Sequence, residues 1–435
     1  MRCGFYEKEI TPPLGGDLPG YFCHRFAENV EDRLYAKAAV FAGDSDDPNQ
    51  MTAILVLDSE EIPAGMREAV IPRASEMTGI PQERIVIAAT HTHYGIPFGS
   101  ACTDRDDEYM KVFYRLAADT VTLAFKRLRK CKLTYGIGYE DTQAFNRDYV
   151  VKTGAVTSIP SPSIQPDIVR SYGGIDPDLP VLTAWDENGN RMGVIFTYAL
   201  HQDSVAMLAF SGDFSSEVSH QLKARYGDGF VSVFLAGYCG DINHIDAIGK
   251  TKRDHRSVGR ALAAEIARVT ESGSAPVADT GVAAVYRILP LSRRKATQEQ
   301  IDWAKYILED PDNRKTPYMS MGSRGCRMLL EYAADFREED SVVDVPLQVL
   351  RIGDVWLFAS PFEMYHQFAA PLKAAADSGK WLITELANMG GGYIPVPELL
   401  GSDTYPAQLN KNNNMEPEAG HKIGKALADM AAQMR

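Results

Sequence analysis

The chain has 435 residues, of which 45% are hydrophobic and 24% are charged, as is typical of a folded protein with a large core. Its formal net charge of −13 argues against a nucleic-acid partner bound through phosphates. No stretch approaches the roughly 18 apolar residues of a membrane-spanning helix, and residues 1–10 lack the apolar core of a secretory signal. We therefore expect a cytoplasmic protein with no integral membrane segment, whose six scattered cysteines are free thiols.

The first clear elements form a strand–helix–strand unit. The nearly all-apolar run 52–58 predicts a buried strand, helical spacing follows over 60–77, and the apolar run 85–89 predicts a second buried strand. The right-handed crossover of such units brings the carboxyl ends of the two strands close together.

The remaining elements continue this alternation without an internal repeat or a linker. We therefore expect an α/β fold of mixed β-sheets and helices, organised as a single domain over residues 1–435. The predicted elements, in chain order, are β structure with turns over 1–60, an amphipathic helix over 109–128, a long loop or irregular lobe over 140–180, a strand over 193–200, a helix over 213–225, a strand over 230–236, a helix over 258–269, a strand over 281–289, a helix over 298–308, a polar turn-rich segment over 310–325, a hairpin of 342–351 and 354–359, a helix from 363 to 376, a strand over 381–386 and a C-terminal helix.

Polar side chains gather where the predicted strands end, which is where α/β proteins usually place their chemistry. They are Asp58, His91, His93, His201, Asp241 and Glu363, with Tyr393 soon after the last strand. A hydrolytic zinc site needs about three histidine or carboxylate ligands and an open position for water, and His91, His201 and Glu363 satisfy that count. From the residues alone, Glu363 is equally well explained as a carboxylate in the first turn of a helix. Tyr393 is better explained as a buried tyrosine with a satisfied hydroxyl than as a ligand.

Other chemistries have weaker support. The sequence contains no GxSxG nucleophile elbow and no P-loop lysine motif. Cys239 follows a predicted strand and is a possible nucleophile with His244, although nothing in the sequence indicates a lowered thiol pKa.

The order of these motifs resembles the catalytic domain of the neutral/alkaline (non-lysosomal) ceramidase family. The most specific match is THTHYGIP at 90–97, which is similar to the THTHSGP signature of that family. The other matches keep the order of the family over roughly residues 5–400, at Ile10-Thr11-Pro12, 33–38, His201 with Ser211-Gly212-Asp213, 240–243, Pro361-Phe362-Glu363 and 386–398.

The resemblance implies a zinc hydrolase with its site at the carboxyl ends of the strands. It assigns the zinc to His91, His201, Glu363 and Tyr393, and it places His93 beside the activated water, where this side chain transfers a proton. The other catalytic candidates are Asp58 and Asp241, and the substrate-binding candidates are Tyr94, Asp254 and Arg33. The substrate is a small molecule with an amide or ester carbonyl. Sites with such nitrogen and oxygen ligands also take iron or manganese.

Departures from the family pattern bear on the substrate and on the domain content. Tyr94 replaces the motif serine, Ile96 is inserted, and Asp254 or a near neighbour stands where the family has an amide-contacting serine. These changes predict a substrate smaller or more polar than ceramide, and we expect no C-terminal immunoglobulin-like domain. The alternatives are a metal-dependent lyase or isomerase acting on a sugar or hydroxy acid, and a non-catalytic metal- or ligand-binding protein. A homo-oligomer is compatible with the sequence.

Overall fold

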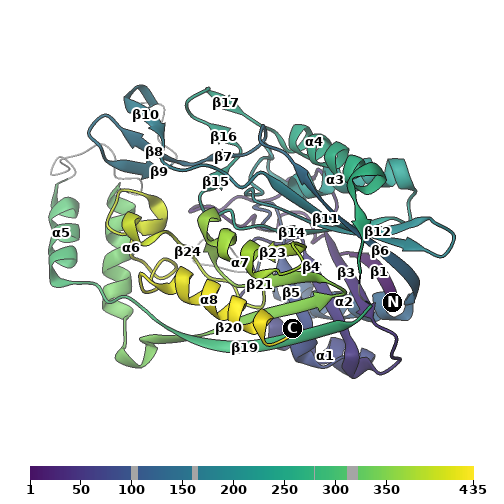
Figure 1. Ribbon diagram of the computed structural model, residues 1–435. Coiled ribbons are helices and arrows are strands. Elements are labelled where there is room, and N and C mark those ends of the chain that lie inside the picture. Colours follow the sequence, from purple (N-terminus) through teal and green to yellow (C-terminus); the bar gives the residue numbers. More distant parts are fainter. Residues whose placement is uncertain (99–105, 159–164, 279, 311–321) are drawn as a thin grey trace.

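The computed structural model describes residues 1–98, 106–158, 165–278, 280–310 and 322–435, and these residues build four layers (Figure 1). Two β-sheets pack face to face, and helices cover the outer face of each sheet. This architecture confirms the predicted α/β class. Within the described ranges, no helix is long and apolar enough to cross a membrane.

The larger sheet has the strand order β14-β12-β11-β6-β1-β3-β4-β5, and β18 pairs with β6. Its strands are β1 (Arg2–Glu9), β3 (Tyr35–Ala42), β4 (Met51–Leu57), β5 (Ile85–Ala89), β6 (Arg129–Tyr139), β11 (Asp178–Asp186), β12 (Arg191–Tyr198), β14 (Val231–Ala236) and β18 (Ala275–Pro276). The second sheet has the order β19-β20-β21-β23, with β19 (Val282–Ser292), β20 (Val342–Ile352), β21 (Val355–Ala359) and β23 (Trp381–Thr384).

Helices pack on the outer faces of these sheets. They are α1 (Met66–Thr78), α2 (Asp107–Lys126), α3 (Asp213–Tyr226), α4 (His255–Arg268), α7 (Ala369–Ala375) and α8 (Ala419–Ala432). Helices α1 to α4 lie against the larger sheet, and α7 and α8 lie against the second sheet, where α8 is drawn in yellow in Figure 1.

The middle of the molecule is apolar because the central strands are buried on both faces. Strand β4 is buried at all seven positions. Its residues Ile54 and Val56 face the second sheet, while Leu55 and Leu57 pack on the helical side. Two-sided burial explains why the sequence shows a continuous apolar run instead of alternation. Replacing a fully buried phenylalanine such as Phe41 by alanine would lower the free energy of unfolding by about 3–5 kcal/mol.

Three parallel strand pairs direct their carboxyl ends to one region. These pairs are β4 with β5, β12 with β14, and β21 with β23, and each pair is connected through a helix. Backbone hydrogen bonds join the ends of the two sheets: Asn388 N–H donates to Ile87 O at 2.7 Å, and Glu385 N–H donates to Ala236 O at 2.9 Å. The segments that follow these strands therefore meet.

Several sequence predictions are confirmed closely. Strand β5 has the predicted bounds, α2 begins two residues before the predicted helix, and the 342–359 hairpin turns at Gly353, whose φ is 62°. Cys3, Cys23, Cys131 and Cys239 are free thiols, and Cys102 lies outside the described residues. Most of the segment predicted as polar and turn-rich over 310–325 also lies outside them.

Two predictions are wrong. The 140–180 region is built from short strands, and β10-β8-β9 forms its own sheet. Pieces of two to four residues are too short to show a periodic pattern. The helix predicted from Glu363 does not begin there, because Phe362 has a φ of 71° and the chain enters a short strand before α7.

The minor strands are β2 (Asn29–Val30), β7 (Phe145–Asn146), β8 (Asp148–Val151), β9 (Val156–Ser158), β10 (Ile168–Ser171), β13 (Ala209–Phe210), β15 (Ile242–Asn243), β16 (Ile245–Asp246), β17 (Thr251–Lys252), β22 (Glu363–Met364) and β24 (Tyr393–Ile394).

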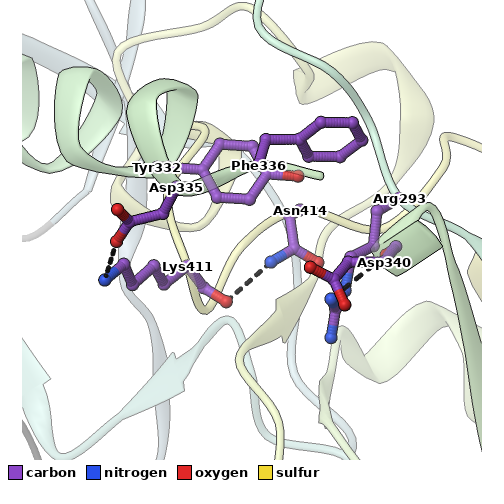
Figure 2. Close-up of a pocket in the computed structure, with 7 residues that line it drawn as sticks. All are labelled: Arg293, Tyr332, Asp335, Phe336, Asp340, Lys411 and Asn414. Atoms are coloured by element: carbon purple, nitrogen blue, oxygen red, sulfur yellow. Dashed lines mark hydrogen bonds and ion pairs between the residues drawn. The ribbon is translucent and has the colours of Figure 1, made fainter. Parts of the chain in front are cut away.

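Helices α5 (Gln298–Glu309) and α6 (Gly322–Asp335) form a small lobe with its own apolar cluster. A hollow of about 230 Å³ lies between the end of α6 and the 411–414 segment. Figure 2 shows side chains that line it. The ion pair of Lys411 with Asp335, 2.6 Å long, lies at its edge. None of the predicted site residues lines this hollow.

Candidate metal centre

His91 is fixed by the turn that follows β5. Its φ is 70°, its N–H donates to Ser59 O at 2.8 Å, and its ring Nδ1 bonds Glu60 O at 2.8 Å. Thr92 then pairs with Gln202 in a parallel bridge, which places the segment after β5 beside the segment after β12. The rings of His91 and His93 lie 5.0 Å apart. Because His91 makes a left-handed turn, the two histidines do not occupy two positions of a regular strand.

The other predicted ligands come from three strand ends. His201 follows β12, and its Nδ1 bonds Cys239 O at 2.9 Å, just beyond β14. Glu363 follows β21, and Tyr393 follows β23. Strands β22 and β24 pair in parallel with Glu363 opposite Tyr393, so one short ladder fixes both side chains.

The polar atoms of these four side chains converge. Glu363 Oε2 lies 3.1 Å from His91 Nε2 and 3.0 Å from His201 Nε2. His201 Nε2 is also 3.2 Å from the Tyr393 hydroxyl oxygen. Both histidines are 2% exposed, and Glu363 is 9% exposed. The structure therefore brings His91, His201, Glu363 and Tyr393 together in a site largely closed to solvent.

The nitrogen and oxygen atoms of these four side chains suit a bound cation. The Nδ1 atoms of His91 and His201 each face a carbonyl oxygen, which only accepts hydrogen bonds, so Nδ1 carries the proton. A neutral ring then presents its Nε2 lone pair to Glu363. Lone pairs and a carboxylate oxygen at these distances repel one another unless a proton or a metal ion lies between them. Backbone acceptors behind the rings are also the usual support of metal-bound histidines.

The pKa values of His91, His201 and Glu363 also indicate that positive charge is favoured at this point. Burial lowers the pKa of His91, but the Glu363 carboxylate outweighs burial and raises it to about 9. Burial and then the His91 charge lower the pKa of His201 to about 3. Burial opposes the ionisation of Glu363, yet His91 and His201 hold its pKa well below its usual range. A cation beside Glu363 is thus electrostatically favoured.

His93 lies next to the four converging side chains. The ligand atoms of His91, His93 and His201 all lie within 4.8 Å of one another, so His93 belongs to a histidine group that could hold a metal. Neither ring nitrogen of His93 has a hydrogen-bond partner in the described part of the chain. Gly20 packs against this ring, because a Cβ at Gly20 would lie 2.1 Å from Nδ1. Burial and the neighbouring His91 lower the pKa of His93 well below its usual value, so the ring is neutral.

Arg147 is a site residue that sequence reasoning missed. Its Nη1 lies 3.4 Å from His201 Nε2, and its guanidinium covers the Tyr393 ring at 4.7 Å. Nε and Nη2 are buried and have no hydrogen-bond partner in the described ranges. Arg147 stands between β7 and β8, in the region predicted to be irregular, where no periodic pattern identifies an inward-facing side chain.

Asp58 and Asp241 do not join the converging side chains. The Asp58 carboxylate is buried and accepts the Tyr35 N–H at 2.7 Å, which ties it to the start of β3, and burial raises its pKa to about 6. The Asp241 carboxylate accepts from His366 N–H at 2.9 Å, from His366 Nδ1 at 2.7 Å and from Asn146 Nδ2 at 2.7 Å. Asp241 therefore connects the strand end after β14 to two other segments.

The Asp241–His366 pair predicts a pH-dependent stability. Burial lowers the pKa of His366, but the hydrogen bond and charge of Asp241 outweigh it and raise this pKa above the ordinary value of about 6.5. When the pKa of a histidine is higher in the folded protein than in the unfolded chain, protonation of that histidine stabilises the fold. This stabilisation is complete at pH values below the pKa of the unfolded chain, and it is lost as the pH rises through the pKa of the folded protein. We expect the loss of unfolding free energy in His366→Gln, measured in urea, to be larger at about pH 6 than at about pH 9. An equal loss at both pH values would contradict this.

The three substrate-binding candidates have different surroundings. The Tyr94 hydroxyl bonds Val205 O and Asp203 Oδ1, the latter at 3.2 Å, so Tyr94 lies near the site but its hydroxyl is engaged. Arg33 forms a surface ion pair with Glu9 at 3.0 Å. The structure does not bring Arg33 or Asp254 to the converging side chains.

Asp254 is the N-cap of α4, and its carboxylate accepts the N–H groups of Arg256 and Ser257. This role predicts that Asp254→Ala lowers the free energy of unfolding by about 1 kcal/mol. The KM for any substrate should stay unchanged, because the side chain serves the helix. Urea denaturation and steady-state kinetics on the same preparation check this, and a raised KM at unchanged stability would restore the substrate-binding role.

Cys239 is a poor nucleophile. It is fully buried, its Sγ donates to Glu385 Oε1 at 3.0 Å, and burial followed by the Glu385 charge raises its pKa well above the ordinary value. A thiol held in its neutral form does not attack a carbonyl. His244 is also buried and does not bond Cys239.

Comparisons with known proteins bear on the fold. No family model matches the sequence, and no curated protein does. Among solved structures, the neutral ceramidase from Pseudomonas aeruginosa matches with a TM-score of 0.72 at 18% identity, over 100% of this chain and 74% of that chain. A structure described as ceramidase complexed with C2 gives the same TM-score and identity, over 100% of this chain and 75% of that one. The resemblance carried by the sequence motifs is therefore confirmed at the level of the fold: over its whole length, this chain has a neutral ceramidase-like fold.

Proposed function

We propose that this protein is a zinc-dependent hydrolase that cleaves an amide or ester bond in a small-molecule substrate smaller or more polar than ceramide. The observation that carries the proposal is the convergence of His91, His201, Glu363 and Tyr393 on one buried point at contacts of 3.0 to 3.2 Å. The ceramidase-like fold supports the reaction class by analogy.

The four converging side chains would hold the metal. Two imidazoles, a carboxylate and a phenol are borderline to hard ligands that suit zinc. When bound there, zinc polarises a carbonyl oxygen and lowers the pKa of a coordinated water toward neutrality.

His93 and Arg147 would complete the chemistry. The neutral His93 ring has a free lone pair, so it takes a proton from the attacking water and passes it to the leaving nitrogen or oxygen. Arg147 Nη2 and Nε have unused hydrogens beside His201, and they donate to the substrate carbonyl oxygen as negative charge develops on it.

Polar residues next to His93 support a polar substrate. Tyr21 packs edge-on against the His93 ring at 5.8 Å, and its hydroxyl donates to Asp203 at 2.7 Å. The Arg25 guanidinium covers the Tyr21 ring at 3.8 Å and donates to His93 O at 2.7 Å. Charged and hydroxyl groups in these positions favour a substrate with polar groups near its scissile bond over one with long alkyl chains only.

A substrate screen with metal-defined protein tests the proposal. The protein is stripped with a chelator, reloaded with one equivalent of zinc, and incubated with short N-acyl amides, lactones and sugar acids. We expect zinc-dependent release of a carboxylic acid from an amide or ester, with one ¹⁸O incorporated from labelled water. Conversion of a sugar acid without ¹⁸O incorporation into a carboxyl group would favour the lyase or isomerase alternative. Stoichiometric zinc without turnover would favour a binding protein.

A further inference from the structure

Glu385 is a buried carboxylate that none of the roles above uses. It directly follows β23 and is 0% exposed. It forms no ion pair with a lysine, arginine or histidine in the described ranges. A carboxylate in such a place is costly unless its oxygens accept hydrogen bonds.

The Glu385 side chain accepts three hydrogen bonds from two segments. Oε2 accepts the Met364 N–H at 2.9 Å and the Cys239 N–H at 3.2 Å. Oε1 accepts from Cys239 Sγ at 3.0 Å. The Glu385 N–H also donates to Ala236 O at 2.9 Å, so its main chain and side chain bind the same strand end.

Both partners are directly connected to predicted metal ligands. Met364 follows Glu363 within β22, so its N–H belongs to the peptide unit that begins at the Glu363 carbonyl. The carbonyl of Cys239 holds His201 Nδ1 at 2.9 Å. One carboxylate therefore fixes the backbone behind Glu363 and the acceptor that orients His201.

We propose that Glu385 is a positioning residue for the metal centre, which joins the Cys239 turn and strand β22 so that His201 Nε2 and Glu363 Oε2 face the same point. This inference rests on the proposed function. Both oxygens of Glu385 accept hydrogen bonds from Cys239 or Met364, and the proposal gives Glu385 no direct contact with the ion. Partners of this kind set ligand geometry and metal affinity.

The test compares Glu385→Gln, Glu385→Ala and the control Glu217→Gln. Gln keeps the shape of the side chain but exchanges one accepting oxygen for an NH2 group. Glu217 is a matched buried glutamate, 4% exposed, whose partners Arg256 at 2.7 Å and Arg260 at 3.2 Å belong to α4. Three quantities are measured: zinc affinity by chelator competition, the visible absorption of the cobalt-loaded protein, and the thermal unfolding of the metal-free protein.

We expect both Glu385 variants to lose roughly 10–100-fold in zinc affinity and to show shifted cobalt bands. Glu217→Gln should unfold at a lower temperature but keep the affinity and the cobalt spectrum of the wild type. Zinc affinity and cobalt bands of Glu385→Gln that equal those of the wild type would overturn the proposal, even if Glu385→Ala does not fold. An equal loss of affinity in Glu217→Gln would overturn it as well, since the effect would then be global. A wild-type protein that binds no metal would overturn both this inference and the proposed function, whereas unaffected variants of a zinc-binding wild type would overturn this inference alone.

Discussion

Replacing His91 or His201 by alanine will abolish stoichiometric metal binding, whereas His93→Gln will keep the metal and lose activity. The expectation follows from geometry: Nε2 of His91 and of His201 contacts Glu363 Oε2, while the His93 nitrogens contact no partner in the described ranges. Losing a general base lowers kcat by roughly 10²–10⁴-fold. Metal content after gel filtration and steady-state kinetics on the same samples separate the two effects.

His220→Ala is the control for this comparison, because His220 lies on α3 with a side chain that is 54% exposed. It should change neither metal content nor kcat. One equivalent of zinc retained by His91→Ala would remove His91 from the ligand set. Loss of zinc in His93→Gln would instead make His93 a ligand, a role that its place within 4.8 Å of His91 and His201 permits.

The second large effect is expected at Asp241. Asp241→Ala leaves donors of His366 and Asn146 without their acceptor, and it removes the buried carboxylate from its pair with the largely buried His366. Removing one partner of such a pair costs about 3–5 kcal/mol. We expect a loss of that size in the free energy of unfolding from urea titrations, together with loosening of residues 145–158, measured by hydrogen exchange.

Asp241→Asn separates this structural role from the catalytic role that the sequence suggested. The amide keeps one accepting oxygen and the size of the side chain, so the variant should fold with a smaller loss of stability. If Asp241 only holds the segments together, the folded Asp241→Asn protein retains most of its kcat. A stable Asp241→Asn variant without activity would show that the carboxylate takes part in the reaction.

The sequence is most informative where burial is continuous. Strand β5 is recognisable because Ile85–Ala89 is buried at every position, and the ends of such strands are where His91, His201 and Glu363 stand. The pairing of the two sheets is not visible in any local pattern, because contacts such as Asn388 N–H to Ile87 O join segments far apart in the chain.

Residues that act through backbone contacts are the hardest to predict. Glu385 looks like an ordinary charged residue after a strand, and only the fold shows that its oxygens accept from Cys239 and Met364. Arg147 is hidden among strands of two to four residues. Asp254 shows the opposite case, because its spacing of three to Ser257 is a local helix-capping signal. The resemblance to the family instead suggested a substrate-binding role for Asp254.

The short ladder that pairs Glu363 with Tyr393 and Met364 with Ile394 bears on when a metal ion could bind. Tyr393 is synthesised long after His91, so a growing chain carries all four proposed ligands only once Tyr393 has been added. A metal ion that needs the whole set would then bind after these distant segments have come together, and it would stabilise that folded state by mass action. Zinc limitation would in that case leave a folded but more easily degraded pool of the protein.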